Sequence, residues 1–114
     1  MASRGDVLVL KRRMGFGAPP EGERVVVLQD DRLNAVRPTA IVAPLDVATS
    51  FFAGSPTAIP VSSAEAATPT AMVALVANLH CLAWDRLAPG AVGRLQPATL
   101  ARIDTMLRFV LGLR

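Results

Sequence analysis

The sequence predicts a mainly β, α+β fold in which a small antiparallel barrel is closed by a C-terminal α-helix. Short apolar, β-branched runs bounded by charged or turn residues recur up to Leu95, as expected for strands. The remaining stretch instead repeats apolar residues every three or four positions, which is the period of a helix face. No internal repeat divides the 114 residues, so we expect one domain over residues 1–114.

Two central strands are predicted at residues 24–28 and 41–45. Both runs are almost continuously apolar, which indicates strands buried on both faces. The connection between them, from Asp30 to Thr39, contains Asp, Asn and Pro, which favour turns. We expect the functional residues at the ends of these two strands.

Further strands are predicted at residues 7–10, 58–61, 71–76 and 91–95, and residues 78–82 either continue the preceding strand or cross to a new one. Pro60 cannot donate a ladder hydrogen bond and therefore indicates an edge strand. Residues 14–23 contain three Gly and two Pro and predict a loop. Residues 51–56 and 62–70 are predicted to be connectors.

The C-terminal helix carries its apolar stripe at Leu100, Ile103, Leu107 and Val110. Pro97 suits the first helical turn and Gly112 suits the stop. Arg102 and Arg108 lie off the stripe and are expected to face solvent.

The composition restricts the possible functions. With 52% hydrophobic and 18% charged residues the chain can bury a core. One Cys (Cys81) and one His (His80) exclude an internal disulfide and an ordinary zinc site, so we expect no metal, no cofactor and a cytoplasmic protein. No apolar run is long enough for a membrane span, and no secretion signal is visible. A net charge of +3, carried almost entirely by Arg, permits a nucleic-acid partner without requiring one.

Five segments resemble, in order, motifs of the MazF/PemK family of toxin–antitoxin toxins. They are the opening Arg4-Gly5-Asp6-Val7, the stretch 22–34 with its Gln29-Asp30-Asp31, the strand 41–45, the segment Asn78-Leu79-His80-Cys81-Leu82 and the closing stretch 95–113. No P-loop, dinucleotide fingerprint or nucleophile elbow is present to suggest another chemistry.

The resemblance implies an SH3-like barrel, a homodimer and a metal-independent endoribonuclease that cleaves single-stranded RNA. It also implies an antitoxin partner whose tail is disordered when free. In the family an Arg and a Ser or Thr usually carry the catalysis. In this sequence we expect Arg24 to stabilise the charge on phosphorus, Asp46 or Thr49 to handle the proton or the 2′-hydroxyl, and His80 to lie beside the substrate. Arg12, Arg13 and Asn78 are the expected RNA-binding residues.

The sequence departs from the family where the chemistry is expected. When the chains are aligned on Gln29, Glu23 stands at the family's catalytic Arg, and only a one-residue shortening restores Arg24 to that role. Asp46 stands where the family has Ser or Thr, and Ala77 where an acidic residue is common. Three alternatives therefore stay open: a catalytically inactive member that acts by binding, a DNA gyrase poison like the related CcdB family, and a small barrel without enzymatic role.

Overall fold

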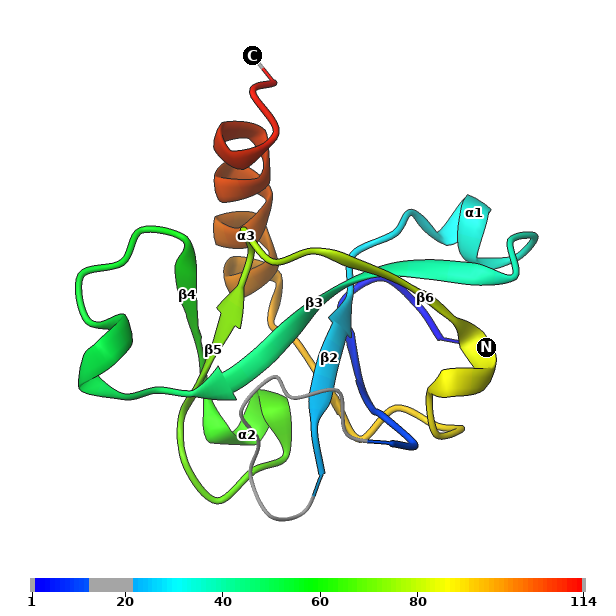
Figure 1. The fold of residues 1–114 in the computed structure, drawn as a ribbon, viewed down its shortest axis with the longest axis horizontal. Helices are drawn as coiled ribbons and strands as arrows, with labels where there is room; N and C mark the ends of the chain where they lie inside the picture. Colours follow the sequence, from blue (N-terminus) through cyan, green and yellow to red (C-terminus); the bar gives the residue numbers. More distant parts are fainter. Residues whose placement is uncertain (1, 13–21, 114) are drawn as a thin grey trace.

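A computed structural model describes residues 2–12 and 22–113 of the chain, and Figure 1 shows their arrangement. The strands of the described part are β1 (Asp6–Val9), β2 (Arg24–Val27), β3 (Thr39–Val47), β4 (Ala58–Val61), β5 (Met72–Leu75), β6 (His80–Ala83) and β7 (Gly93–Arg94). The helices are α1 (Asp31–Asn34), α2 (Ser63–Ala66) and α3 (Pro97–Val110), with 3₁₀ turns η1 (Ser50–Phe52) and η2 (Trp84–Arg86). None of these helices is long and apolar enough to cross a membrane.

The sheet is antiparallel and curls around its longest strand, β3 (Figure 1). Its order is β4-β5-β3-β2-β1-β7, with β6 also paired to β3. One edge of β3 pairs with β2, while the other edge pairs first with β6 and then with β5. This branching makes β3 the axis of a half-barrel and confirms the predicted β-class fold.

The two faces of β2 and β3 bury separate apolar clusters. Val26 and Leu45 belong to the cluster that also contains Ile103 of α3. Val25 and Val42 belong to the cluster on the opposite face. Because neighbouring strand residues point to opposite faces, the predicted burial of both faces is confirmed.

The predicted C-terminal helix is α3, and its stripe faces the core. Ile103 is fully buried, and Leu100, Leu107 and Val110 pack against the same cluster. Pro97 is the first helical residue, and Gly112 follows the end of the helix with φ +69°. The predicted start at Pro97 and the predicted stop at Gly112 are therefore confirmed.

Some local predictions are corrected by the structure. The strand predicted at 91–95 contains only Gly93 and Arg94, and the segment 78–82 enters a new strand only at His80. The predicted turn 30–39 and connector 62–70 each contain a one-turn helix. Side-chain caps explain both turns: Asp30 accepts a hydrogen bond from Arg32 N, and Ser62 forms a capping box with Glu65. Most of the loop predicted at 14–23 lies outside the described residues.

The N-terminal residues and the β2–β3 connection are tied together by polar contacts. Arg4 donates from its backbone N to Asp31 and from Nε to the Leu28 carbonyl, and its guanidinium pairs with Asp104 of α3. The buried Gln29 amide donates to Asn34 Oδ1 at 3.0 Å. These contacts give the Arg-Gly-Asp opening and the Gln-Asp-Asp stretch a structural role.

Candidate active site at the end of the central strands

The face of β3 that carries Pro44 leads from an apolar cluster to a polar edge. Pro44 lies directly opposite Val25 of β2, and Val42 lies directly opposite His80 of β6. Residues that face each other across antiparallel strands share a side of the sheet, as do residues two apart on one strand. His80 and Asp46 therefore lie on the Pro44 face, one on each side of that proline.

Glu23 joins this face from β2. Extending the β2–β3 register by two residues beyond the Val25–Pro44 pair sets Glu23 opposite Asp46. Its carbonyl accepts a hydrogen bond from Leu10 N at 2.9 Å, which continues the pairing with the strand on the other side. Glu23 is 1% exposed, whereas Asp46 is half-buried and accepts a hydrogen bond from Val47 N at 2.7 Å. Two carboxylates thus face the same edge of the sheet.

Arg24 points to the opposite side. It alternates with Val25 and so shares the face of Val26, under which α2 lies. Its Nη1 donates to the Gly22 carbonyl at 3.0 Å and its Nη2 to the Ala67 carbonyl at 3.1 Å, just after α2. Its Nε is buried and has no hydrogen-bond partner in the described part of the chain. The side chain is 6% exposed and is held as a bridge between two backbone segments.

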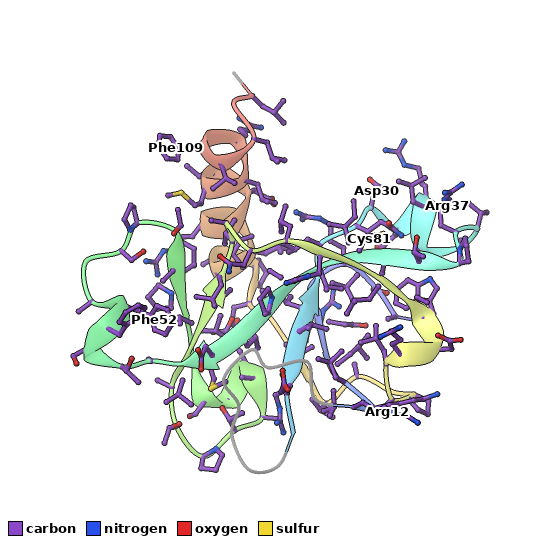
Figure 2. The ribbon with its side chains drawn as sticks, in the orientation of Figure 1. Arg12, Asp30, Arg37, Phe52, Cys81 and Phe109 are labelled. Carbon is purple, nitrogen blue, oxygen red and sulfur yellow. The ribbon has the colours of Figure 1, made fainter. Side chains whose placement is uncertain are left out.

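The other predicted site residues are spread over the surface. Thr49 is exposed directly before η1, three residues after Asp46, and Asn78 is exposed in the turn that precedes β6. Arg12 is exposed after β1, and Figure 2 shows it on the far side of β2 from the end of β3. Arg13 lies outside the described residues.

The structure thus brings Asp46 and His80 to one face, with Thr49 beyond the strand end, and separates Arg24 and Arg12 from them. Glu23 was not among the predicted site residues. The alternation along β2 was the available signal, because a residue two before Val25 shares the face of Val25. What the sequence lacked was the register that sets Glu23 opposite Asp46.

The carboxylate and imidazole groups on this face are suited to proton transfer rather than to neutralising the charge of a phosphate. A carboxylate can accept a proton near neutral pH, and an imidazole can accept or donate one. Two adjacent carboxylates also repel a phosphate, so an anionic substrate requires cationic groups nearby. The described residues contain no group of three or more His, Cys, Asp or Glu that could hold a metal ion.

Comparison with known proteins identifies similar folds. The model of the PemK-like, MazF-like toxins of type II toxin–antitoxin systems matches residues 3–111. A solved endoribonuclease in complex with its cognate antitoxin from Mycobacterial species is 21% identical over 99% of this chain and 95% of that chain, with a TM-score of 0.73. No curated protein sequence matches the chain.

Two further solved structures have the same fold. The Mycobacterium tuberculosis toxin MazF-mt6 is 14% identical over 96% of this chain and 98% of that chain, with a TM-score of 0.75. A MazE-MazF structure from Deinococcus radiodurans is 17% identical over 99% of this chain and 98% of that chain, with a TM-score of 0.74. These likenesses confirm the predicted barrel with its C-terminal helix.

Proposed function

The chain belongs to the family of PemK-like, MazF-like toxins of type II toxin–antitoxin systems, and we propose that it is a metal-independent endoribonuclease acting on single-stranded RNA. The observation that carries the proposal is that Asp46 and His80 lie on the same face of the sheet, with His80 opposite Val42, four residues before Asp46 on β3. The endoribonucleases from Mycobacterial species with the same fold support it. An RNA substrate implies action in the cytoplasm.

The proposed reaction is an in-line displacement within the RNA. The 2′-oxygen attacks the adjacent phosphorus, the bond to the 5′-oxygen breaks, and the products are a 2′,3′-cyclic phosphate and a 5′-hydroxyl. Asp46 accepts the proton of the 2′-hydroxyl, with Thr49 as the alternative group that orients this hydroxyl, and His80 donates a proton to the departing 5′-oxygen. Asn78, Arg12 and Arg13 are proposed to bind the flanking RNA, because amide and guanidinium groups donate to phosphate oxygens.

Arg24 is proposed to stabilise the charge on phosphorus once substrate is bound. This role requires its guanidinium to leave the Gly22 and Ala67 carbonyls, to which it donates in the free protein, and to reach the face of the sheet opposite the one on which it lies. We expect Arg24→Ala to abolish cutting, and we expect Arg24→Lys to retain part of it, since the charge is kept. If both variants lose the same thermal stability and their folded fraction cuts RNA at the parent rate, Arg24 is a structural residue and its proposed catalytic role is wrong.

The experiment that tests the proposal is incubation of the purified protein with a long single-stranded RNA in EDTA. Discrete cuts ending in 2′,3′-cyclic phosphates are expected. Intact RNA at a large excess of protein would contradict the proposal. A zinc- or magnesium-dependent contaminant would be inhibited by EDTA, so the chelator separates it from the proposed activity.

A second candidate function is binding without catalysis. It is favoured by Glu23, which stands at the family's Arg position when the chains are aligned on Gln29 and which faces the same edge as Asp46. Such a protein would be non-toxic and would still bind its antitoxin. The family match supports the ribonuclease hypothesis over a DNA gyrase poison.

A cognate antitoxin with a tail that is disordered when free is the proposed partner. The antitoxin complexes solved for proteins of the same fold support an antitoxin. We also propose a homodimer, because Ile41 is 42% exposed and lies directly opposite the exposed Cys81 on the sheet. An apolar row of this kind favours cover by a second copy. A monomeric mass by light scattering at micromolar concentration would contradict the dimer.

A further inference from the structure

The connection between β3 and β4 forms one wall of a surface groove of about 380 Å³. Thr49 and Phe52 line it from the connection, Pro60 and Val73 from the sheet, and Arg102 from α3. Figure 2 shows Phe52 in the space between the β3–β4 connection and β4. The groove is formed entirely by described residues.

The groove continues the candidate active site across the sheet. Asp46 of β3 lies directly opposite Val73 of β5, and Val73 lies directly opposite Pro60 of β4. Directly opposed residues share a face, so these three form one row. Adjacent strands are about 4.8 Å apart, which sets the groove within about two strand spacings, roughly 10 Å, of Asp46. A single nucleotide spans a distance of this order.

The tip of the connection presents an aromatic surface. Phe51 is 85% exposed, and its ring meets that of Phe52 at 88° with centroids 5.1 Å apart. Because the rings are perpendicular, neither stacks flat on the other, and Phe51 keeps ring surface open to solvent. An exposed aromatic ring beside a groove is a platform on which a nucleobase can stack whatever its identity.

The charge of the groove complements a phosphate. Arg102 is the charged residue that lines it, and no Asp or Glu is among its described lining residues. The Thr49 hydroxyl adds a neutral donor and acceptor beside it. A nucleotide can bind to all three of these groups. Its base stacks on a flat apolar surface, and its phosphate and sugar oxygens bind a guanidinium and a hydroxyl.

We propose that this groove is a subsite for one unpaired nucleotide next to the cut bond, with its base stacked on Phe51 and its phosphate bound by Arg102. The inference rests on the proposed ribonuclease function and deepens it. It also supplies a cation to an RNA chain that passes Asp46: Arg102 would bind the neighbouring phosphate in the groove, about two strand spacings from Asp46.

The backbone at the outer edge of β4 argues against a peptide strand as the occupant of the groove. Val76 N donates to the Thr57 carbonyl, so the backbone groups of Thr57 face β5. Because these groups alternate in direction along a strand, those of Ala58 and Pro60 point away from β5, toward the outer edge of β4. Ala58 N already donates to the Ser55 carbonyl, and Pro60 has no N–H. The outer edge of β4 therefore has no free donor with which to pair an added strand.

The test measures binding of a fluorescein-labelled, random-sequence 12-nucleotide RNA carrying 2′-O-methyl groups, which cannot be cut because the nucleophile is blocked. Stacking contributes about 1–3 kcal/mol per base, so we expect Phe51→Ala to weaken binding about tenfold and Phe51→Trp to restore it. Arg102→Gln should lower the slope of log affinity against log salt by about 0.7, as for the loss of one phosphate contact.

The matched controls lie on α3 outside the groove. Phe109→Ala removes an aromatic ring that is 74% exposed, and Arg108→Gln removes an exposed Arg of the same helix. Both should bind the RNA like the parent. Cutting of unmodified RNA should also slow in Phe51→Ala, with the base preference of the cut sites unchanged because stacking does not discriminate among bases, and it should proceed at the parent rate in Phe109→Ala.

The outcomes separate the two proposals. A parent protein that cuts and binds RNA, together with a Phe51→Ala variant indistinguishable from Phe109→Ala, would overturn the subsite alone. A parent that neither binds nor cuts RNA would overturn both the subsite and the ribonuclease. If Phe51→Ala leaves RNA binding and cutting intact and prevents rescue by a co-expressed cognate antitoxin, the groove belongs to the antitoxin and the subsite proposal is wrong.

Discussion

The two faces of β2 and β3 differ in what they carry, although they are built from alternating residues of the same strands. On one face Val26 and Leu45 join the core beneath α3, and Arg24 on that face donates to two backbone carbonyls. On the other face the apolar cluster around Val25 ends at Glu23 and Asp46. The first face fixes the position of the helix, and the second supplies the polar edge of the candidate site.

This difference explains why the fold is easier to recognise than the site. The segments that carry the resemblance hold the scaffold: Arg4 joins the β2–β3 connection to α3, and Gln29 with Asn34 closes that connection. Glu23 and Asp46, which the sequence comparison on Gln29 and Pro44-Leu45 sets apart from the expected family motifs, both lie on the polar-edged face. The family match and the shared fold therefore rest on the scaffold, and the functional groups have to be tested by experiment.

The largest loss of stability is expected for Gly93→Ala. A Cβ at this position would lie 2.0 Å from the Glu65 carbonyl oxygen, and a backbone atom cannot move aside as a flexible side chain does. We expect a loss of at least about 3 kcal/mol in the free energy of unfolding, measured by urea denaturation. Gly112→Ala, at φ +69° with open space around it, should cost only about 1 kcal/mol. Equal effects would show that α2 does not pack tightly against β7.

The next largest effect tests the apolar face. Ile103 is fully buried, so Ile103→Ala should lower the free energy of unfolding by about 3 kcal/mol through the lost transfer energy and the cavity. Phe109→Ala removes a larger side chain from the same helix, but at 74% exposure it should change stability by less than about 0.5 kcal/mol. The same urea titration measures both, and a reversed ranking would contradict the observed orientation of α3.

A smaller effect is expected for Glu65→Gln. Glu65 accepts hydrogen bonds from Ser62 N at 3.0 Å and from Gln96 N at 2.7 Å, and thereby joins α2 to the start of α3. An amide in place of the carboxylate turns an NH₂ group toward one of these donors, at a cost of about 1–2 kcal/mol. Asp85→Asn, at an exposed carboxylate, is the control and should be close to neutral.

Glu65 also predicts a pH dependence. Burial raises the pKa of Glu65, but hydrogen bonds from Gln96 N, Ser62 and Thr99 outweigh burial and leave the pKa below its ordinary value of 4.5. A carboxyl with a depressed folded-state pKa stabilises the fold above its unfolded pKa, and this contribution is lost as the pH falls through the folded value. The parent should lose stability below about pH 4.5 more steeply than Glu65→Gln. Parallel curves would mean that Glu65 contributes nothing to the acid sensitivity.

Most of the scaffold was predictable from sequence because its signals are periodic. The central strands are apolar at nearly every position, and α3 repeats its stripe through three turns. The helices α1 and α2 were missed because one helical turn has no period and depends on caps at Asp30 and Ser62. Capping residues also favour plain turns, so the sequence pattern did not separate the two structures.

The candidate site was predictable only in part. The resemblance singled out Asp46 and His80, and the structure sets both on one face. It did not anticipate that Arg24 would donate to two carbonyls on the opposite face, because that depends on the position of α2. Nor did it identify Glu23, whose position opposite Asp46 follows from a register that local sequence does not encode.

The most direct test of this division between the faces is Asp46→Asn, studied for cutting and for stability in one preparation. Asn retains an oxygen that can accept the hydrogen bond from Val47 N, so the free energy of unfolding should change by less than about 0.5 kcal/mol. The single-turnover rate of RNA cutting in EDTA should fall at least about 100-fold if the carboxylate accepts the proton. An unchanged rate, or a rate that falls only as far as the folded fraction does, would contradict the account.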